Sequence, residues 1–470
     1  MTFPNLSRLA LPAGGPSAHG ERRTSASPFH TMARVLLLAT ICAAPWAFGA
    51  VQAWAWGTLI VLYFLILILW AVGCAHRGVL KMSWSPLYWP FLAFLILASL
   101  QLLAGFTADH WATREAVLKI FGDLVLFFLA GQLLTQPDNG RALEWLGLIV
   151  SLLALALCIL ALAQRFGSGG SRLIYWTIPV PVGPFGPYVN HNDYAGLMEM
   201  LLPISVAYVL SQSLHGILRN VLWCGVGLVI SSIWMCGSRG GAVVLVVQGL
   251  LLAGILIGSR PRGGPLRSFP LLLAVVLISA LVFSWMASTG RVAGNAWSVF
   301  ETNRSLDVTL GDRMRVGMDT LRIVRSHPWL GIGVGCFEDV FPSYLTFAKD
   351  LHWTHAHDDV LEAVAETGLP GAIMILAGAV LFLRTAFRHL ESRLLHGWGW
   401  IQMGATVGAV GLFCHSFVDF NLRVPANAAW FVVCLAIATH PRPDQQNFQK
   451  NAWDLRPDRG SEFLTSGPPA

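Results

Sequence analysis

The sequence predicts an all-α polytopic membrane protein that crosses the bilayer about twelve times. Of its 470 residues, 55% are hydrophobic and only 12% are charged, which is about half the charged fraction of a soluble globular protein. The apolar residues form long continuous runs of roughly the ~20 residues that a transmembrane helix needs. Continuous runs argue against a membrane β-barrel, whose strands alternate in polarity. Soluble enzymes, disordered chains and single-span receptors are excluded.

The apolar runs define one membrane domain between two polar tails. In order, the twelve runs are residues 33–50, 54–74, 86–105, 115–134, 142–163, 193–211, 218–236, 240–258, 269–287, 369–387, 397–417 and 424–440. The domain spans residues 32–440, and the tails are residues 1–31 and 441–470. Their polar, proline-containing composition is typical of disordered segments. The first run is long enough to remain as a helix rather than be cleaved as a signal peptide.

Basic residues in the short loops predict the orientation. With twelve spans, both tails lie on one side, and the loops of that side carry Arg77, Lys81, Arg141, Arg219, Arg260, Arg262, Arg267, Arg384, Arg388 and Arg393. The positive-inside rule therefore places both tails in the cytoplasm. The same rule accounts for the net charge of +6, so we expect no nucleic-acid partner. Two longer connections, 164–192 and 288–368, then face outward, and the second is too long to be a passive loop.

The outer segment begins with an amphipathic pattern over residues 313–326. Arg313 falls on the packed face, whereas Arg315, Asp319, Arg322 and Arg325 fall on the side predicted to be solvated. Burying a guanidinium group without an anion is costly. Arg313 therefore needs a partner, which is either a protein carboxylate or an anionic ligand.

A second helix is predicted over residues 354–367, ended by Gly368 and Gly371. On this helix His357 shares a face with apolar residues, next to an acidic stripe. The stripe consists of Asp358, Glu362 and Glu366. A histidine on such a face is either a satisfied core residue or a general base.

Neighbouring histidines and aspartates raise the alternative of a metal site. The cluster consists of His352, His355, His357, Asp358 and Asp359. Val360 stands where the related binuclear hydrolase motif has its third histidine, and no distant set completes the ligands. The eight cysteines form no CxxC pair. We therefore expect neither a metal nor another cofactor.

Three further polar elements border apolar runs. Arg239 lies between glycines, which either lets it reach the membrane surface or opens the backbone to a phosphate. Asn190 and Asn192 precede a run. Either Asn192 or Asp193 caps the helix there, or the amide side chains of Asn190 and Asn192 hold sugar hydroxyls. His415 and Asp419 follow the eleventh run. They form either an interfacial polar pair or a support for a functional residue.

Together these motifs resemble the O-antigen ligase and polymerase superfamily of bacterial glycan-assembly membrane proteins. The family signature is a His, an Asn, Ser or Gln, nine residues, a Gly, two residues and a Gly. His357, Gly368 and Gly371 match it, with Asp358 at the second position. An Arg before a His-Pro-x-x-Gly-x-Gly turn is matched by Arg313 and His327–Gly333, although Gly317 replaces the usual Trp.

Two further motifs extend the resemblance: Arg239 matches the Ser-Arg-Gly step, and Asn190 with Asn192 matches the Asn-x-Asn element. The resemblance implies a fold of the GT-C type in the bacterial inner membrane, with a large helical periplasmic segment between the ninth and tenth helices. It also implies transfer of a glycan from undecaprenyl diphosphate to an acceptor hydroxyl, without a metal. The acceptor is a glycan or a lipid A–core molecule, and membrane lipids surround the protein.

Residue roles follow from the resemblance: His357 as the general base, and Arg239 with Arg313 as the diphosphate clamp. The residues expected to contact the glycan or to support the site are Asn190, Asn192, His355, Asp358, His415 and Asp419. Ligase, polymerase and protein O-oligosaccharyltransferase activities remain open. A flippase is the alternative from another class, but it would require charges and broken helices within the bilayer. Asp123 is one such charge.

Overall fold

The computed structural model describes residues 27–135, 140–167, 184–211, 216–259, 310–347, 352–388, 397–440 and 452–454. Apart from two three-residue strands, the regular structure of these residues is helical, which confirms the all-α class. Eight of the described helices are long and apolar enough to cross a membrane. The protein is therefore a multi-pass membrane protein by the length and composition of its helices.

The helices follow the predicted apolar runs closely. The first part of the chain contains α1 (Pro28–Ala43), the 3₁₀ turns η1 (Ala44–Trp46) and η2 (Phe48–Ala50), α2 (Ala53–Arg77), β1 (Val79–Lys81), α3 (Tyr88–Leu103), α4 (His110–Leu134), α5 (Gly140–Gly167) and α6 (His191–Leu210). The remainder contains α7 (Gly216–Cys236), α8 (Arg239–Ser259), α11 (Leu310–Ser326), α12 (Phe337–Val340), η4 (Phe341–Ser343), α13 (Asp359–Phe387), α15 (Gly397–His415), η5 (Asn421–Arg423), α16 (Pro425–Thr439) and β2 (Ala452–Asp454). Eleven of the twelve predicted runs thus contain helix; the run at 269–287 lies outside the described residues.

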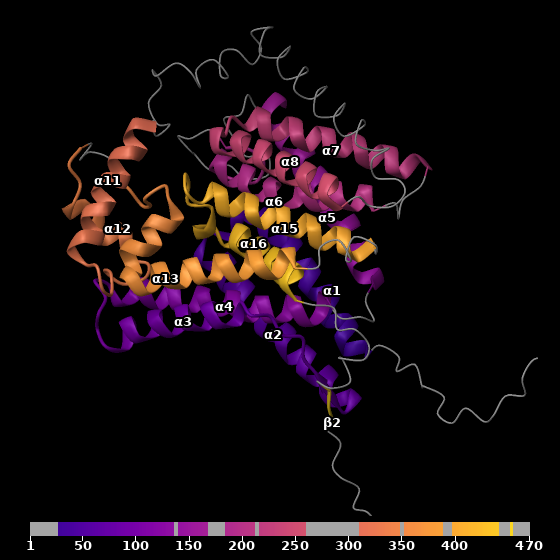
Figure 1. The fold of residues 1–470 in the computed structure, drawn as a ribbon, viewed down its shortest axis with the longest axis horizontal. Helices are drawn as coiled ribbons and strands as arrows, with labels where there is room; N and C mark the ends of the chain where they lie inside the picture. Colours follow the sequence, from indigo (N-terminus) through magenta and orange to yellow (C-terminus); the bar gives the residue numbers. More distant parts are fainter. Residues whose placement is uncertain are drawn as a thin grey trace, which may run out of the picture.

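Helix α6 forms the centre of the bundle. It is buried along its whole length, and Figure 1 shows it near α15 and α16, with α1–α4 on one side and α7 and α8 on the other. Glycines on α15 allow the closest contact: a β-carbon at Gly404 would lie 2.6 Å from the Ile204 Cα, and one at Gly408 would lie 2.9 Å from the Met200 carbonyl. Small residues at such crossings let two helix backbones approach within the membrane.

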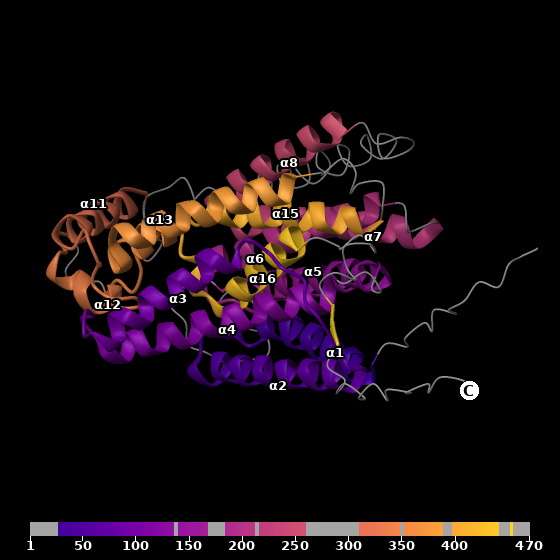
Figure 2. The same ribbon diagram turned by 60° about the horizontal axis from the view of Figure 1, so that its bottom comes forward.

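The two ends of the bundle differ. Helices α11 and α12 and the beginning of α13 lie at one end, and strand β2 lies at the other (Figures 1 and 2). Near β2, His30 at the start of α1 contacts Arg77 at the end of α2 over 3.2 Å. The start of α1 and strand β2 therefore lie at the end away from α11 and α12.

The described part of the predicted outer segment has its own small core. Its buried residues include Val316, Ile323, Phe337, Phe341 and Trp353. This core joins α11 to α12 and to the segment before α13. The described part of the long connection, residues 310–347 and 352–368, is thus a packed helical layer, as its periodicity predicts.

One residue of α11, Asp319, is buried although the sequence predicts that it is solvated. Asp319 was assigned to the solvated side, but it is only 2% exposed. Its carboxylate accepts the Thr346 N–H over 2.9 Å and pairs with Arg322 over 3.1 Å. The chain after η4 folds back over this flank, so a helical face that is polar in sequence is nevertheless covered.

The predicted helix over 354–367 is also corrected. Helix α13 begins only at Asp359 and continues to Phe387, with a kink at Gly368, whose φ and ψ are 66° and −158°. His357 precedes the helix and has a left-handed backbone, with φ of 54°. The prediction that His357 lies on the apolar face of the helix is therefore wrong, because the helix begins at Asp359 and not at residue 354.

The kink interlocks with the turn after α11. The Ile332 N–H donates to the Ala365 carbonyl over 3.1 Å, and the Leu369 N–H donates to the Pro328 carbonyl over 2.8 Å. A β-carbon at Gly368 would lie 2.6 Å from the Trp329 carbonyl. The two glycine motifs of the sequence therefore meet at one tight contact.

Replacing Gly368 with alanine should destabilise the protein by about 1–3 kcal/mol, because non-glycine residues are strained in this backbone region. Thermal unfolding of the detergent-purified protein measures the loss. Gly378→Ala is the matched control on the same helix, since its β-carbon would meet Pro90 at an ordinary 3.7 Å. Equal losses in the two variants would contradict the assignment of strain to the kink.

Cysteine labelling should place the end that carries α11 outside the cytoplasm, as the basic loops predict. Trp329→Cys, at a site that is 72% exposed, should react with a membrane-impermeant maleimide in intact spheroplasts. His76→Cys, at the end of α2, should react only after permeabilisation. The parent chain controls for its own eight cysteines. The reverse pattern would invert the topology.

Candidate functional site

A buried carboxylate, Asp419, lies at the centre of the candidate site. It follows α15 and is shielded from solvent. His357 Nδ1 lies 3.3 Å from one of its oxygens and Arg313 Nη1 lies 3.5 Å from the other. Burial acts to raise the pKa of Asp419, but the His357 hydrogen bond and the Arg313 charge outweigh it and lower the pKa to about 2. The carboxylate is therefore ionised at neutral pH and joins three separate parts of the chain.

His357 is held so that one ring nitrogen faces Asp419. Its ring makes edge contacts with Phe420 and Trp353, at centroid distances of 5.0 and 6.1 Å. Since the carboxylate accepts a hydrogen bond from Nδ1, the neutral ring carries its proton there and Nε2 is the acceptor. None of the described residues forms a hydrogen bond with Nε2. The ring thus offers a basic nitrogen from a fixed orientation.

Glu362 fixes the backbone immediately before His357. Its buried carboxylate accepts the Ala356 N–H over 2.7 Å and pairs with His355 Nδ1 over 3.1 Å. Arg423 Nε lies 3.3 Å from the same carboxylate, and Arg423 Nη2 lies 2.6 Å from Glu366. This group of charges holds the segment that carries the unfavourable backbone conformation of His357.

Sequence reasoning missed Arg423 and treated Glu362 and Glu366 only as an acidic stripe on the helix. Both glutamates are buried. Two buried carboxylates one helical turn apart require a cation, because an unpaired buried charge is strongly unfavourable. This need for a cation could have identified Arg423, which is the arginine between the last two apolar runs, as the partner of the two glutamates.

Asp358 acts as the N-cap of α13. Its side chain accepts the Leu361 N–H over 2.8 Å. Asn and Ser fill this position as well as Asp does. The departure from the family signature therefore has a structural reason, since Asp358 keeps the capping role.

Helix α8 begins against His415. The His415 ring pairs through Nδ1 with Glu199 of α6, at 2.9 and 3.1 Å, and both side chains are buried. A β-carbon at Gly240 would lie 2.5 Å from His415 Nε2. The glycine beside Arg239 thus lets α8 begin at this pair. The sequence reasoning did not identify Glu199, an acidic residue within the sixth apolar run, as a candidate partner of His415.

Arg313, and Gly240 beside Arg239, lie against the same connection, residues 415–419. Arg239 is the first residue of α8 and is exposed. The Val418 side chain lies next to Gly240, and the Val418 carbonyl accepts a hydrogen bond from Arg313 over 2.6 Å. Arg313 thus has a protein carboxylate and a carbonyl as partners. Of the two partners that the sequence allowed, a protein carboxylate or an anionic ligand, the structure contains the first.

Asn190 and Asn192 belong to a neighbouring amide network. Asn190 caps α6 by accepting the Asn192 N–H over 2.9 Å. Its amide also lies 3.4 Å from Asp193, whose carbonyl accepts a hydrogen bond from Asn427 over 2.9 Å. The predicted cap, Asn192 or Asp193, is therefore wrong, because the helix begins at His191 and Asn190 caps it. A role in binding sugar hydroxyls stays a prediction.

The histidine cluster divides among three carboxylates. His352 pairs with Glu338 over 2.6 Å, while His355 and His357 pair with Glu362 and Asp419. Within the described part of the chain, no group of three or more His, Cys, Asp or Glu residues is arranged to hold a metal ion.

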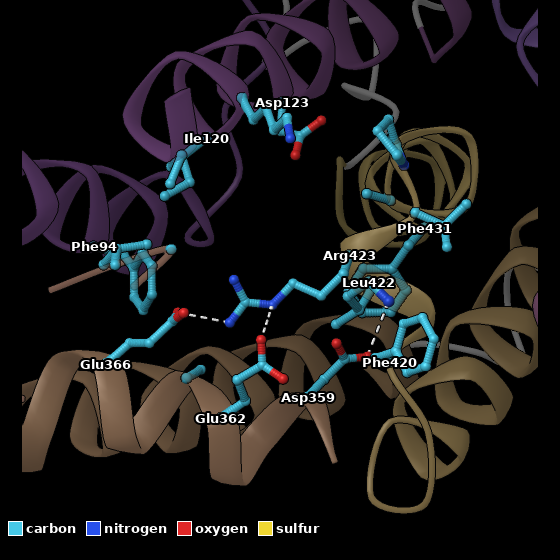
Figure 3. Close-up of a pocket in the computed structure, with 18 of the residues that line it drawn as sticks. Phe94, Ile120, Asp123, Asp359, Glu362, Glu366, Phe420, Leu422, Arg423 and Phe431 are labelled. Atoms are coloured by element: carbon cyan, nitrogen blue, oxygen red, sulfur yellow. Dashed lines mark hydrogen bonds and ion pairs between the residues drawn. The ribbon is translucent and has the colours of Figure 1, made fainter. Parts of the chain in front are cut away.

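A cavity of about 1010 Å³ lies beside this site. It is bounded by α2, α3, α4, α6, α12, α13, α15, η5 and α16, and its lining includes His355, Asp359 and Arg423. Figure 3 shows Arg423 between Glu366 and Glu362, with Asp123 on the opposite wall. His357 does not line the cavity, although His355 does.

No curated protein matches the chain. A family model described as O-antigen ligase matches residues 224–376. The matched region contains Arg239, Arg313 and His357, whereas His415 and Asp419 lie beyond it. The match confirms the resemblance inferred from the motifs: residues 224–376 are similar to the O-antigen ligase family.

Proposed function

We propose that the protein is a glycosyltransferase that moves a glycan from undecaprenyl diphosphate to an acceptor hydroxyl at the periplasmic face of the inner membrane. The observation that carries this proposal is the His357–Asp419 pair, in which a buried carboxylate fixes the ring and leaves Nε2 as the base. The O-antigen ligase match over residues 224–376 supports the reaction class. The proposed reaction requires no metal.

In the proposed reaction, the acceptor hydroxyl donates its hydrogen bond to His357 Nε2. As the acceptor oxygen attacks the anomeric carbon, its proton passes to Nε2. The bond from the anomeric carbon to the diphosphate oxygen breaks, and its electron pair leaves with the diphosphate. Attack from the face opposite the leaving group inverts the anomeric centre. The Asp419 carboxylate, 3.3 Å from Nδ1, stabilises the imidazolium that forms.

The leaving diphosphate is assigned to Arg239 and Arg313. Arg239 begins α8 and is exposed, so its charge adds to the partial positive charge of a helix N-terminus, which favours anions. Arg313 is only partly occupied by its protein partners, because both recorded contacts use Nη1. Its remaining N–H groups are available to a phosphate, which planar guanidinium groups bind well.

Three activities share this chemistry and differ in the acceptor: glycan ligase, glycan polymerase and protein O-oligosaccharyltransferase. Reconstitution of the purified protein with one defined lipid-diphosphate donor tests them together. The donor is supplied with a lipid A–core acceptor, a second donor glycan, or an acceptor peptide. The mass of the product then identifies the activity, and the absence of transfer to every acceptor would contradict the proposed function.

His357→Ala should lower turnover by about 10²–10⁴-fold, the usual contribution of a positioned base, while donor binding stays near that of the parent. His352→Ala should retain turnover, since this histidine pairs at the surface with Glu338. Asp358→Asn should also retain it, because Asn preserves the helix cap. Transfer by His357→Ala at the parent rate would refute the mechanism.

Arg239→Ala and Arg313→Ala should each weaken transfer about ten- to hundredfold, which corresponds to the loss of a charged hydrogen bond worth ~1.5–3 kcal/mol. Lysine should restore little, because an ammonium group lacks the planar fork. Arg315→Ala is the control on α11; that side chain is exposed and lies 5.6 Å from the Phe347 ring. Donor binding and elution volume are measured alongside turnover. Equal effects at Arg313 and Arg315 would contradict the clamp.

A further inference from the structure

A second histidine–carboxylate pair lies beside the proposed base. His355 Nδ1 lies 3.1 Å from the carboxylate of Glu362. This geometry repeats that of His357, whose Nδ1 lies 3.3 Å from Asp419. Both carboxylates are buried. The proposed reaction uses His357 as the base but leaves the second imidazole, two residues earlier in the chain, without a role.

The hydrogen-bonding state of His355 follows from its partner. Glu362 also pairs with Arg423 over 3.3 Å, so its charge is already balanced and the imidazole need not be cationic. Since the carboxylate accepts the proton on Nδ1, Nε2 of the neutral ring is a hydrogen-bond acceptor. No described residue donates a hydrogen bond to His355 Nε2. This nitrogen therefore remains available to a donor from outside the protein.

The position of His355 makes Nε2 accessible. The side chain is 29% exposed and lines the cavity, and Nε2 is not among the buried polar atoms. Phe420 stacks against the ring, with centroids 4.6 Å apart and an interplanar angle of 29°. The same Phe420 ring contacts His357 edge-on, over 5.0 Å. Two imidazoles, each held by a carboxylate, thus share one aromatic neighbour, and His355 faces the cavity.

The chemistry of Nε2 favours a hydroxyl as its ligand. A neutral imidazole nitrogen accepts a hydrogen bond from a sugar hydroxyl, whereas an ionised diphosphate has no proton to donate. Asp359 and Glu366 line the same cavity, and their carboxylates also disfavour a phosphate there. A sugar carries several hydroxyls of similar reactivity. A single base does not determine which of them attacks, but a second contact on the same sugar does.

We propose that His355 is a specificity-determining residue that binds the acceptor sugar. Its Nε2 accepts a hydrogen bond from one hydroxyl and thereby presents another hydroxyl of the same sugar to His357. His355 itself transfers no proton. The inference rests on the proposed function, because His357 receives the acceptor proton in that reaction. It adds that the acceptor offers a sugar rather than a protein side chain.

Two substitutions separate the roles of the two ring nitrogens. His355→Asn places an amide at the position of Nδ1, so a donor to Glu362 is kept, but nothing replaces Nε2. His355→Gln extends its amide toward the position of Nε2. We expect His355→Asn and His355→Ala to raise the acceptor KM about tenfold, the loss of one hydrogen bond, with kcat nearly unchanged. His355→Gln should restore most of the KM.

The linkage of the product provides a second measurement. The parent should join the glycan to one hydroxyl of the acceptor sugar, and His355→Asn should give a mixture of linkages by NMR. If His355→Asn keeps the parent KM and linkage, His355 serves only to pair with Glu362 and the proposal is wrong. Equal losses in His355→Asn and His355→Gln would also overturn it. Transfer by the parent to a peptide alone would do so as well, since a peptide offers no sugar.

Chemical protection tests the contact without turnover and without a substitution at His355. Diethyl pyrocarbonate modifies the full-length chain in amphipol, and mass spectrometry quantifies the modification of each histidine. Lipid A–core and the lipid-diphosphate donor glycan are added separately as probes. We expect one of them to slow the modification of His355 about fivefold at a saturating concentration. His352, whose side chain is 68% exposed, is the control and should react at an unchanged rate. Absence of protection by both probes would contradict the proposal.

The two proposals fail in different ways. Protection is measured equally well on His357→Ala, which needs no activity for this experiment. If His357→Ala loses transfer but His355 is neither protected nor sensitive to substitution, the reaction stands and the role of His355 fails. If His355 is protected and His357→Ala still transfers glycan, His355 binds the sugar and the assignment of the base fails.

Discussion

The architecture of the site depends on one buried negative charge. Asp419 has no exposed surface, and a carboxylate in such a place is stable only when cations and hydrogen-bond donors surround it. Those partners come from distant parts of the chain: Arg313 from α11 and His357 from the segment before α13. The outer layer is thereby fixed onto the membrane bundle at the point where the chemistry is proposed.

A second group of charges holds the backbone that precedes His357. The arginine of η5 and the two glutamates of α13 hold the chain ahead of His357, and the interlocked glycine turns hold the kink behind it. The signature spacing from His357 to Gly368 therefore has a physical basis. It is the length of helix between the residue that turns toward Asp419 and the residue that must fit beneath the Trp329 carbonyl.

The helices could be predicted from sequence because a bilayer demands continuous apolar runs in which backbone groups bond within the segment. Arg313, His357 and Asp419 were also found as candidates, through the cost of burying charge and through motif spacing. The sequence did not predict which charged side chains pair with each other, or which helix faces are covered by another segment of the chain. A helical projection shows which residues share a face, but not that the chain near Thr346 covers Asp319 or that Glu362 faces Arg423.

The same limit applies to His415 and to the cavity. His415 was expected to support the site or to pair with Asp419, and the sequence does not show that Glu199, a residue 216 positions earlier, pairs with it. The cavity draws its lining from nine of the described elements, so no local sequence pattern reveals it. Features that depend on one segment can be predicted from the sequence, whereas features that depend on contacts among several segments require the structure.

The left-handed backbone of His357 has a consequence for the timing of catalysis. With φ of 54°, this residue occupies a conformation that the unfolded chain rarely visits. The free energy that keeps it there comes from contacts made during folding, including the Glu362 contact to Ala356. In the proposed reaction, the imidazole therefore needs no reorganisation when substrate arrives, and the activation barrier does not include the free energy of orienting this ring.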